Sequence, residues 1–255
     1  MTECRLLEEL TRTESRTAAE KTLVVWPVGA IEQHGPHLPV GTDTFTIEFL
    51  TRQAAEKASS EISVHIAPTL PFGSSHHHLP FGGTMSLTTQ TYYRIVYELA
   101  ESLIVCGYRK IFVLNGHGGN HELVQLVARD LALNYPVSIA AASYWTIAWD
   151  ALVELNAHND CRLPGHAGKF ETSVMMALRP DLIHEPRPHR DHTGSTDPRG
   201  SVRPYRAEHH GSWQAIDGFT DSPDRGTSEL GRRWLDATVD ALAKAMVEFD
   251  SQATV

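Results

Sequence analysis

Side chains that commonly bind metal ions are concentrated just after an apolar run near the start of this 255-residue sequence. In GAIEQHGPHLPVGTDT (29–44), Glu32 and His34 are two residues apart, and Asp43 follows nine residues after His34. Carboxylate oxygens and imidazole nitrogens together suit Zn²⁺, Mn²⁺ or Fe²⁺. Asp43 also stands at the start of a helical stretch, so it either binds a metal or caps that helix.

A second group of candidates follows another apolar run. In VLNGHGGNHE (113–122), His117 lies between glycines, and Gly118 and Gly119 would let the backbone approach a metal or a substrate closely. Glycine-rich turns also bind phosphates through backbone N–H groups, so a nucleotide-binding loop is an alternative. The stretch lacks the Lys-Ser/Thr pair of a P-loop and the full G-x-G-x-x-G spacing.

The remaining candidates lie in two histidine-containing stretches. In PGHAGKFETS (164–173), His166 is a candidate acid–base group, and Glu171 is either a metal ligand or a first-turn carboxylate that the helix dipole favours. In SSHHHLPFGGTMSL (74–87), three adjacent histidines cannot all face one site from an extended chain. His78 is the candidate among them, and a loop or subunit contact is the alternative.

These stretches lie among segments that alternate between strand and helix patterns. Short apolar segments predict strands at 22–28, 62–70, 109–116 and 137–145. Longer periodic segments predict helices at 45–59, 90–107, 120–135, 169–178 and 228–249. The alternation predicts an α/β fold with a mostly parallel sheet and helices on both faces. Ligands of such sheets bind at the carboxyl ends of the strands, where Glu32 and His117 fall.

Composition limits the classes of protein that fit. Hydrophobic residues make up 41% of the chain, which suffices for a core, and we treat 1–255 as a single domain. Three cysteines without a C-x-x-C pair argue against a disulfide framework. A net charge of −9 argues against general binding to nucleic acid or anionic membranes.

Two further expectations concern location and a long irregular segment. No apolar run reaches the roughly 18 residues of a membrane span, and the charged start of the chain lacks a signal-peptide core. We therefore expect a cytoplasmic protein. The segment 185–211 is rich in Pro, Arg, His and Gly and too long for an ordinary connection, so we expect a lid or an oligomer interface there.

The motifs VGAIEQHGPHLPVGTDT, LNGHGGN and HAGKFETS, in this order and spacing, resemble the creatininase (creatinine amidohydrolase-like) family. The resemblance implies a three-layer α/β/α fold and two divalent metal ions, Zn²⁺, Mn²⁺ or Fe²⁺. By motif, Glu32, Asp43 and His117 would bind one ion, and His34 and Asp43 the other, so that Asp43 bridges the pair. The resemblance also implies a homo-oligomer, because the family tends to form hexamers.

The sequence departs from true creatininases in the glycine loop. Gly119 stands where those enzymes have the glutamate that completes the second ion site. Many family members share the GHGGN form, and in them the glutamate of the ETS motif serves instead. By that analogy, Glu171 is the fifth ligand.

Two departures concern the substrate. Gly165 replaces a glutamate immediately before His166, and Arg162 replaces the tryptophan that packs on the creatinine ring. Arg162 therefore stands at a substrate-binding position without the aromatic ring, which argues against creatinine itself. Trp145 or Trp149 is an alternative pocket aromatic.

We therefore expect a metal-dependent amidohydrolase that cleaves an amide C–N bond in a cyclic amide, a formamide or a small peptide-like substrate. The metal pair would activate a water for attack, and His166 would protonate the departing nitrogen. Three alternatives stay open: a true creatinine amidohydrolase, a non-catalytic metal- or ligand-binding protein of the same fold, and a nucleotide-binding α/β protein.

Overall fold

The computed structural model describes residues 2–190 and 209–254. In this part of the chain, the fold is built on a five-stranded sheet in which every neighbouring pair is parallel, in the order β1-β3-β2-β4-β5. The strands are β1 (Cys4–Leu6), β2 (Leu23–Val28), β3 (Val64–Ile66), β4 (Lys110–Asn115) and β5 (Ser138–Ser143). Because β2 and β4 pair along their whole length, the loops that follow them leave the sheet side by side.

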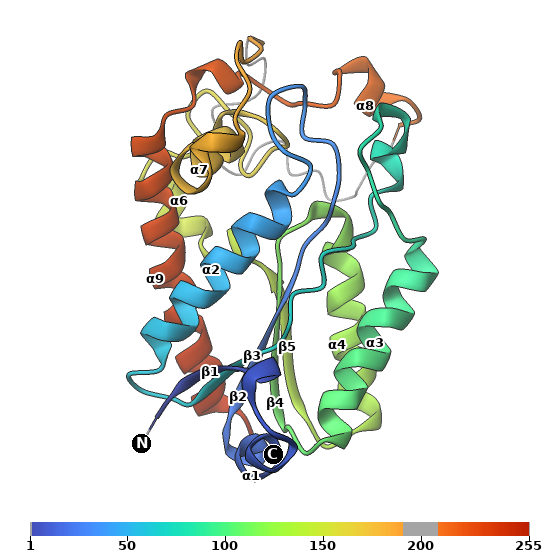
Figure 1. Ribbon diagram of the computed structural model, residues 1–255, viewed down its shortest axis with the longest axis vertical. Helices are drawn as coiled ribbons and strands as arrows, with labels where there is room; N and C mark the ends of the chain where they lie inside the picture. The colour runs from blue at the N-terminus through green and yellow to red at the C-terminus, as the bar shows by residue number, and fades with distance from the viewer. Residues whose placement is uncertain (1, 191–208, 255) are drawn as a thin grey trace.

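Helices cover both faces of the sheet, with α2 and α9 on one face and α3 and α4 on the other (Figure 1). The helices are α1 (Arg12–Ala18), α2 (Thr42–Ala58), α3 (Thr89–Val105), α4 (His121–Asn134), α5 (Tyr144–Ile147), α6 (Trp149–Glu154), α7 (Lys169–Leu178), α8 (Ser212–Ala215) and α9 (Ser228–Gln252). The expected three-layer α/β/α fold is confirmed. The short helices α7 and α8 lie at the end of the sheet opposite α1 (Figure 1).

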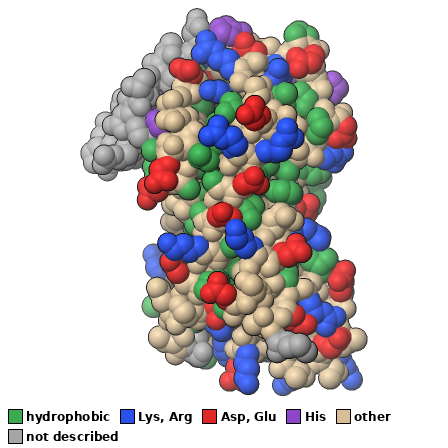
Figure 2. All heavy atoms as spheres, turned by 90° about the vertical axis from the view of Figure 1, so that its left-hand side faces the viewer, with side chains coloured by type: hydrophobic (Ala, Val, Ile, Leu, Met, Phe, Trp, Pro, Cys, Tyr) green, Lys and Arg blue, Asp and Glu red, His purple; other side chains and the backbone are tan. Residues whose placement is uncertain are grey.

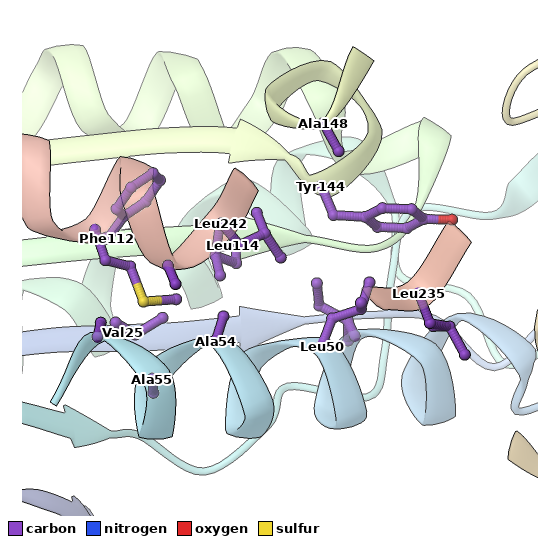
Figure 3. Packing of buried hydrophobic residues seen from close by; sticks show 14 of the residues in the cluster. Val25, Leu50, Ala54, Ala55, Phe112, Leu114, Tyr144, Ala148, Leu235 and Leu242 are labelled. Carbon is purple, nitrogen blue, oxygen red and sulfur yellow. The ribbon is translucent and has the colours of Figure 1, made fainter. Parts of the chain in front are cut away.

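The core forms two apolar layers, one on each face of the sheet. Every residue of β2 is buried, and successive side chains point to opposite faces. Val25 therefore packs toward α2 and α9, whereas Trp26 packs toward α3 and α4. Figure 3 shows the first layer, where Leu50 and Ala54 of α2 face Leu242 of α9.

Most of the helices and strands expected from the sequence are present. Helix α7 has the bounds expected from its pattern, and α2 begins at Thr42 with Gly41 as its N-cap and no side-chain cap. The helix-cap alternative for Asp43 is therefore wrong.

Strand β1 was not expected, because three residues at a sheet edge carry no readable alternation. Of the predicted lid or interface, 191–208 lies outside the described residues.

Acidic and basic side chains are interspersed over the face seen from the α9 side (Figure 2). Mixed charge of this kind gives that face no field of a single sign. Among the described residues, no helix is both long and apolar enough to span a bilayer.

Candidate metal centre

Five of the predicted site residues meet at the carboxyl ends of the central strands. Glu32 and His34 lie in the loop after β2, Asp43 in the first turn of α2, His117 directly after β4, and Glu171 in the first turn of α7. All five side chains are buried. The structure thus brings together in one place donors that are far apart in the sequence.

Two asparagines hold these loops in place. The side chain of Asn115, the last residue of β4, donates to the carbonyl of His117 at 2.6 Å and accepts from its N–H at 3.1 Å. Asn120 donates to the carbonyl of Gly29 at 3.1 Å and accepts from the N–H of Ser74 at 3.0 Å. The loops after β2 and β4 are therefore joined by hydrogen bonds.

Asp43 lies between two histidines and presents one oxygen to each. Its Oδ1 is 3.2 Å from Nε2 of His34, and its Oδ2 is 3.1 Å from Nδ1 of His117. Oε2 of Glu32 lies 3.2 Å from the same nitrogen of His117, and Oε2 of Glu171 lies 3.6 Å from Nε2 of His34. The donors thus divide into two halves that share Asp43.

Backbone contacts orient both histidines toward the carboxylates. Nδ1 of His34 faces the carbonyl of Glu32 at 3.1 Å, and Nε2 of His117 faces the carbonyl of Ser74 at 3.2 Å. A carbonyl only accepts, so each of these nitrogens carries a proton and donates it. The other ring nitrogen of each histidine therefore points into the site, as in metal-binding histidines whose outer nitrogen donates to the protein.

Several carboxylate oxygens of the site are buried close to histidine nitrogens but without a hydrogen bond of good geometry from the described residues. Both side-chain oxygens of Glu32 and Oδ2 of Asp43 have no partner with hydrogen-bond geometry. Burying such oxygens is costly unless they are paired or bind a cation. His34, Asp43 and Glu171 also offer ligand atoms within 4.8 Å of one another. The residues present therefore fit divalent cations.

The electrostatics of the site also favour bound cations. Burial lowers the pKa of His34, but the carboxylates of Asp43 and Glu171 outweigh it and raise that pKa to about 10. Burial, reinforced by Asp43, raises the pKa of Glu171 to about 8, although His34 acts in the opposite direction. Burial also lowers the pKa of His117, but Glu32 and Asp43 raise it well above its usual value. Protons on the two histidines thus supply the positive charge that these carboxylates require.

His166 and His78 lie beside this cluster and are held neutral. Burial, together with His34, lowers the pKa of His166 well below its usual value. Burial, together with His77, lowers the pKa of His78 to about 2. Nδ1 of His166 and Nε2 of His78 each lie 3.6 Å from Oε1 of Glu32.

Gln33 connects these two histidines, although it was not among the candidates expected from the sequence. Its Oε1 accepts from the N–H of Gly35 at 2.8 Å, and its Nε2 lies 3.0 Å from the carbonyl of Gly218 and 2.9 Å from Nδ1 of His78. Nε2 of His166 lies 2.9 Å from the carbonyl of Gln33 and 3.1 Å from its side-chain Nε2. The two amide hydrogens of Gln33 serve Gly218 and His78, and a carbonyl can only accept, so Nε2 of His166 carries the proton of the neutral ring. Nδ1 of His166 consequently has the free lone pair.

A cavity of about 660 Å³ opens onto the cluster. Among its lining residues are Gly118, Gly119, His78, His166 and Trp145, all singled out from the sequence. Its volume falls in the range of small-molecule sites.

Of the expected lining residues, Trp145 is confirmed and Arg162 is not. Arg162 is exposed and is not among the lining residues, and its backbone N–H donates to Asp221. Trp149 is not among them either. Instead, the cavity contains Trp213 of α8, whose ring centroid lies 4.8 Å from that of His78 and 5.2 Å from that of His166. No motif surrounds Trp213 in the sequence, so no pattern pointed to it.

Close packing explains why residue 119 is glycine. A Cβ at this position would lie 2.2 Å from the carbonyl oxygen of Ser74 and 2.6 Å from Nε2 of His117. Any side chain here would displace the contact that orients His117. A glutamate ligand at this position is therefore excluded by space, whereas Glu171 reaches the same cluster from α7.

A family model described as creatinine amidohydrolase matches residues 8–246. The chain belongs to the creatininase family. Members of this family are hydrolases that act on amide C–N bonds, and the match spans nearly the whole chain. The creatininase resemblance that rested on three motifs is thereby confirmed.

The relatives of this creatininase-family chain carry different names. A mycofactocin precursor peptide peptidase from Mycobacterium tuberculosis is 29% identical, over 94% of this chain and 90% of the relative. A creatinine amidohydrolase from Pseudomonas putida is 30% identical, over 92% of each protein. Among solved structures, a manganese creatininase ("Creatininase Mn") matches with a TM-score of 0.74 and 25% identity, over 96% of this chain and 98% of that one. A mutant creatininase of Zn-Zn type matches with a TM-score of 0.72 and 26% identity, over 95% of this chain and 97% of that one.

Proposed function

We propose that this chain is an amidohydrolase that uses two divalent cations, Zn²⁺ or Mn²⁺, held by five side chains. Glu32, Asp43 and His117 would hold one ion, and His34, Asp43 and Glu171 the other. The observation that carries the proposal is the placement of Asp43, whose two oxygens face the two histidines at 3.2 and 3.1 Å. Cations at such donors supply Lewis acidity, which lowers the pKa of water and polarises an amide carbonyl.

His166 is proposed as the group that moves the proton. Its Nε2–H donates a hydrogen bond to the carbonyl of Gln33, and the ring is neutral because burial lowers its pKa. Nδ1 therefore accepts a proton from the attacking water first, and then gives that proton to the departing amide nitrogen. His166 becomes an acid only after it has acted as a base.

The rest of the cavity would bind and orient the substrate. Gly118 and Gly119 line it, and Gly118 has open space around the position of a Cβ, so a substrate can approach the backbone closely there. His78 presents Nε2 toward the cluster, since its Nδ1 accepts from Gln33. We propose a small amide as substrate, either a cyclic amide, a formamide or a short peptide.

Metal stripping and reloading test the proposal. We expect stripped protein to be inactive, and one ion at about 100 times its dissociation constant to raise the melting temperature by about 5–10 °C. Reloaded protein should hydrolyse at least one member of a panel that contains creatinine, lactams, formamides and short peptides. His166→Gln should keep both ions and lower kcat by about 100- to 10,000-fold. Full activity of the stripped protein would contradict the mechanism, and metal uptake without turnover on the whole panel would favour a non-catalytic binding protein.

We also propose that the chain forms a homo-oligomer, with the hexamer suggested by the family resemblance as the specific form. Sedimentation velocity at several protein concentrations measures this directly. A monomer at all concentrations would contradict it.

A further inference from the structure

A buried carboxylate from a distant segment caps the helix that carries Glu171. Asp221 is fully buried. Its Oδ1 accepts from the N–H of Lys169 at 2.7 Å, and its Oδ2 accepts from the N–H of Arg162 at 3.1 Å. Lys169 is the first residue of α7, and the helix has no side-chain cap of its own. Asp221 thus serves one of the N–H groups that a helix start leaves unsatisfied.

Gly168, the residue before Lys169, has no side chain and so leaves room for this carboxylate. A Cβ on Gly168 would lie 2.5 Å from both oxygens of Asp221. A local capping side chain at position 168 and the distant carboxylate are therefore mutually exclusive. The glycine at the N-cap leaves the start of α7 dependent on Asp221.

Thr220 performs a parallel task for His166. The N–H of His166 donates to Oγ1 of Thr220 at 3.0 Å, and the N–H of Thr220 donates to the carbonyl of His166 at 2.9 Å. The hydroxyl of Thr220 in turn donates to Oδ2 of Asp221 at 2.9 Å. Two adjacent residues therefore fix both the backbone of His166 and the first turn that presents Glu171.

Arg190 holds the segment that leads into this pair. Arg190 donates to the carbonyls of Ile216 and Phe219 at 2.7 and 2.6 Å. Its guanidinium also lies 4.0 Å from the centroid of the Phe219 ring. A cation over an aromatic face that also makes two hydrogen bonds restrains the chain immediately before Thr220.

We propose that Thr220 and Asp221 are positioning residues, which set the placement of His166 and Glu171 relative to the rest of the site. This inference rests on the proposed function, because it assigns Asp221 to the ion held by Glu171 and Thr220 to the proton transfer by His166. Groups that orient ligands from behind typically change metal affinity or activity by about 10- to 100-fold.

Asp221→Asn tests the helix-cap part, with Asp224→Asn as the matched control, because Asp224 is in the same segment and forms an ion pair with His189 near the surface. We expect Asp221→Asn to lower the affinity for one of the two ions by about 10- to 100-fold and to leave the affinity for the other unchanged. In stripped protein, it should also speed amide hydrogen exchange at Arg162 and Lys169. Asp224→Asn should change neither quantity.

Thr220→Val tests the second part without touching a charge. We expect both ions to stay bound, kcat to fall and KM to change little, and Thr220→Ser to restore kcat because it keeps the hydroxyl. Suppose that wild-type protein binds two ions, that Asp221→Asn has the same two affinities and the same amide exchange, and that Thr220→Val has the same kcat. The positioning role is then wrong, whereas the proposed function stands. If wild-type protein binds no ion and cleaves no amide, the proposed function is wrong. The exchange measurement on stripped Asp221→Asn then still decides whether the cap exists. If instead wild-type protein is active but Asp221→Asn does not fold, kcat of Thr220→Val and of Thr220→Ser decides the positioning role.

Discussion

Oδ2 of Asp43 lies 3.1 Å from Nδ1 of His117, while the other oxygen of the same carboxylate turns to His34. This relationship joins the start of α2 to the end of β4. It also makes Asp43 common to both halves of the donor cluster, whereas Glu32 and Glu171 each belong to one half.

Metal stoichiometry should reflect that division. We expect Glu32→Gln and Glu171→Gln each to retain about one ion per chain, and Asp43→Asn to retain almost none, because only Asp43 contributes to both ions. Elemental analysis after dialysis measures the content. Asp240→Asn, at an exposed ion pair with Lys57, is the control and should keep the wild-type content. Equal losses in all three site variants would contradict separate halves.

Metal binding should release protons. Burial lowers the pKa of His34, but the neighbouring carboxylates outweigh it and raise that pKa to about 10, and burial raises the pKa of Glu171 to about 8. At pH 7 both groups therefore hold protons that a cation must displace, so affinity should increase with pH until these groups are deprotonated. Calorimetric titration in buffers with different ionisation enthalpies gives the number of protons. A binding heat that is the same in every buffer would rule out the displacement.

Trp213 should contribute to substrate binding. It lines the cavity and packs against His78 and His166. An aromatic contact of this kind is worth about 0.5–1.5 kcal/mol, so Trp213→Ala should raise KM by about 2- to 10-fold with a smaller change in kcat. Trp149→Phe, outside the cavity, is the control. Steady-state kinetics on the best substrate of the panel measure both, and an unchanged KM would remove Trp213 from the binding site.

The stability of stripped protein should depend on His37 below neutral pH. Burial, together with His34 and Arg187, lowers the pKa of His37 to about 4. Between pH 6.5 and about pH 4, the unfolded chain therefore binds a proton on this histidine that the folded protein does not bind. The free energy of unfolding consequently decreases as the pH is lowered through this window. His37→Gln should reduce that slope by up to about 1.4 kcal/mol per pH unit. Urea unfolding at several pH values gives the slope, and identical slopes for both proteins would contradict the assignment.

Local patterns predicted the fold and much of the site because the relevant residues follow strands. The helical pattern of 169–178 gave the bounds of α7, and residues at two strand ends were expected to meet because parallel strands end at the same edge. Glu171 could be placed only by resemblance, since first-turn carboxylates are common. The structure gives the reason for its position, because Gly119 has no space for a side chain.

The contributions of Gln33, Trp213 and Asp221 could not be read in advance. Each acts through contacts across long sequence separations, as with the hydrogen bond between Gln33 and Gly218. Nothing in local composition records such a contact. Arg162 shows the converse, because the motif resemblance assigned it to the substrate, whereas it is exposed and is not among the residues that line the cavity.

The dependence of α7 on Asp221 has a consequence for biosynthesis. The residues proposed to bind the metals are all translated before Asp221, the carboxylate proposed to position Glu171. A growing chain therefore carries an incomplete site until Asp221 has left the ribosome, and α9, which packs on α7 and α2, emerges later still. Nascent chains arrested just before Asp221 should fail to retain metal, whereas full-length chains should retain it, so the cell would not lose scarce ions to incomplete copies.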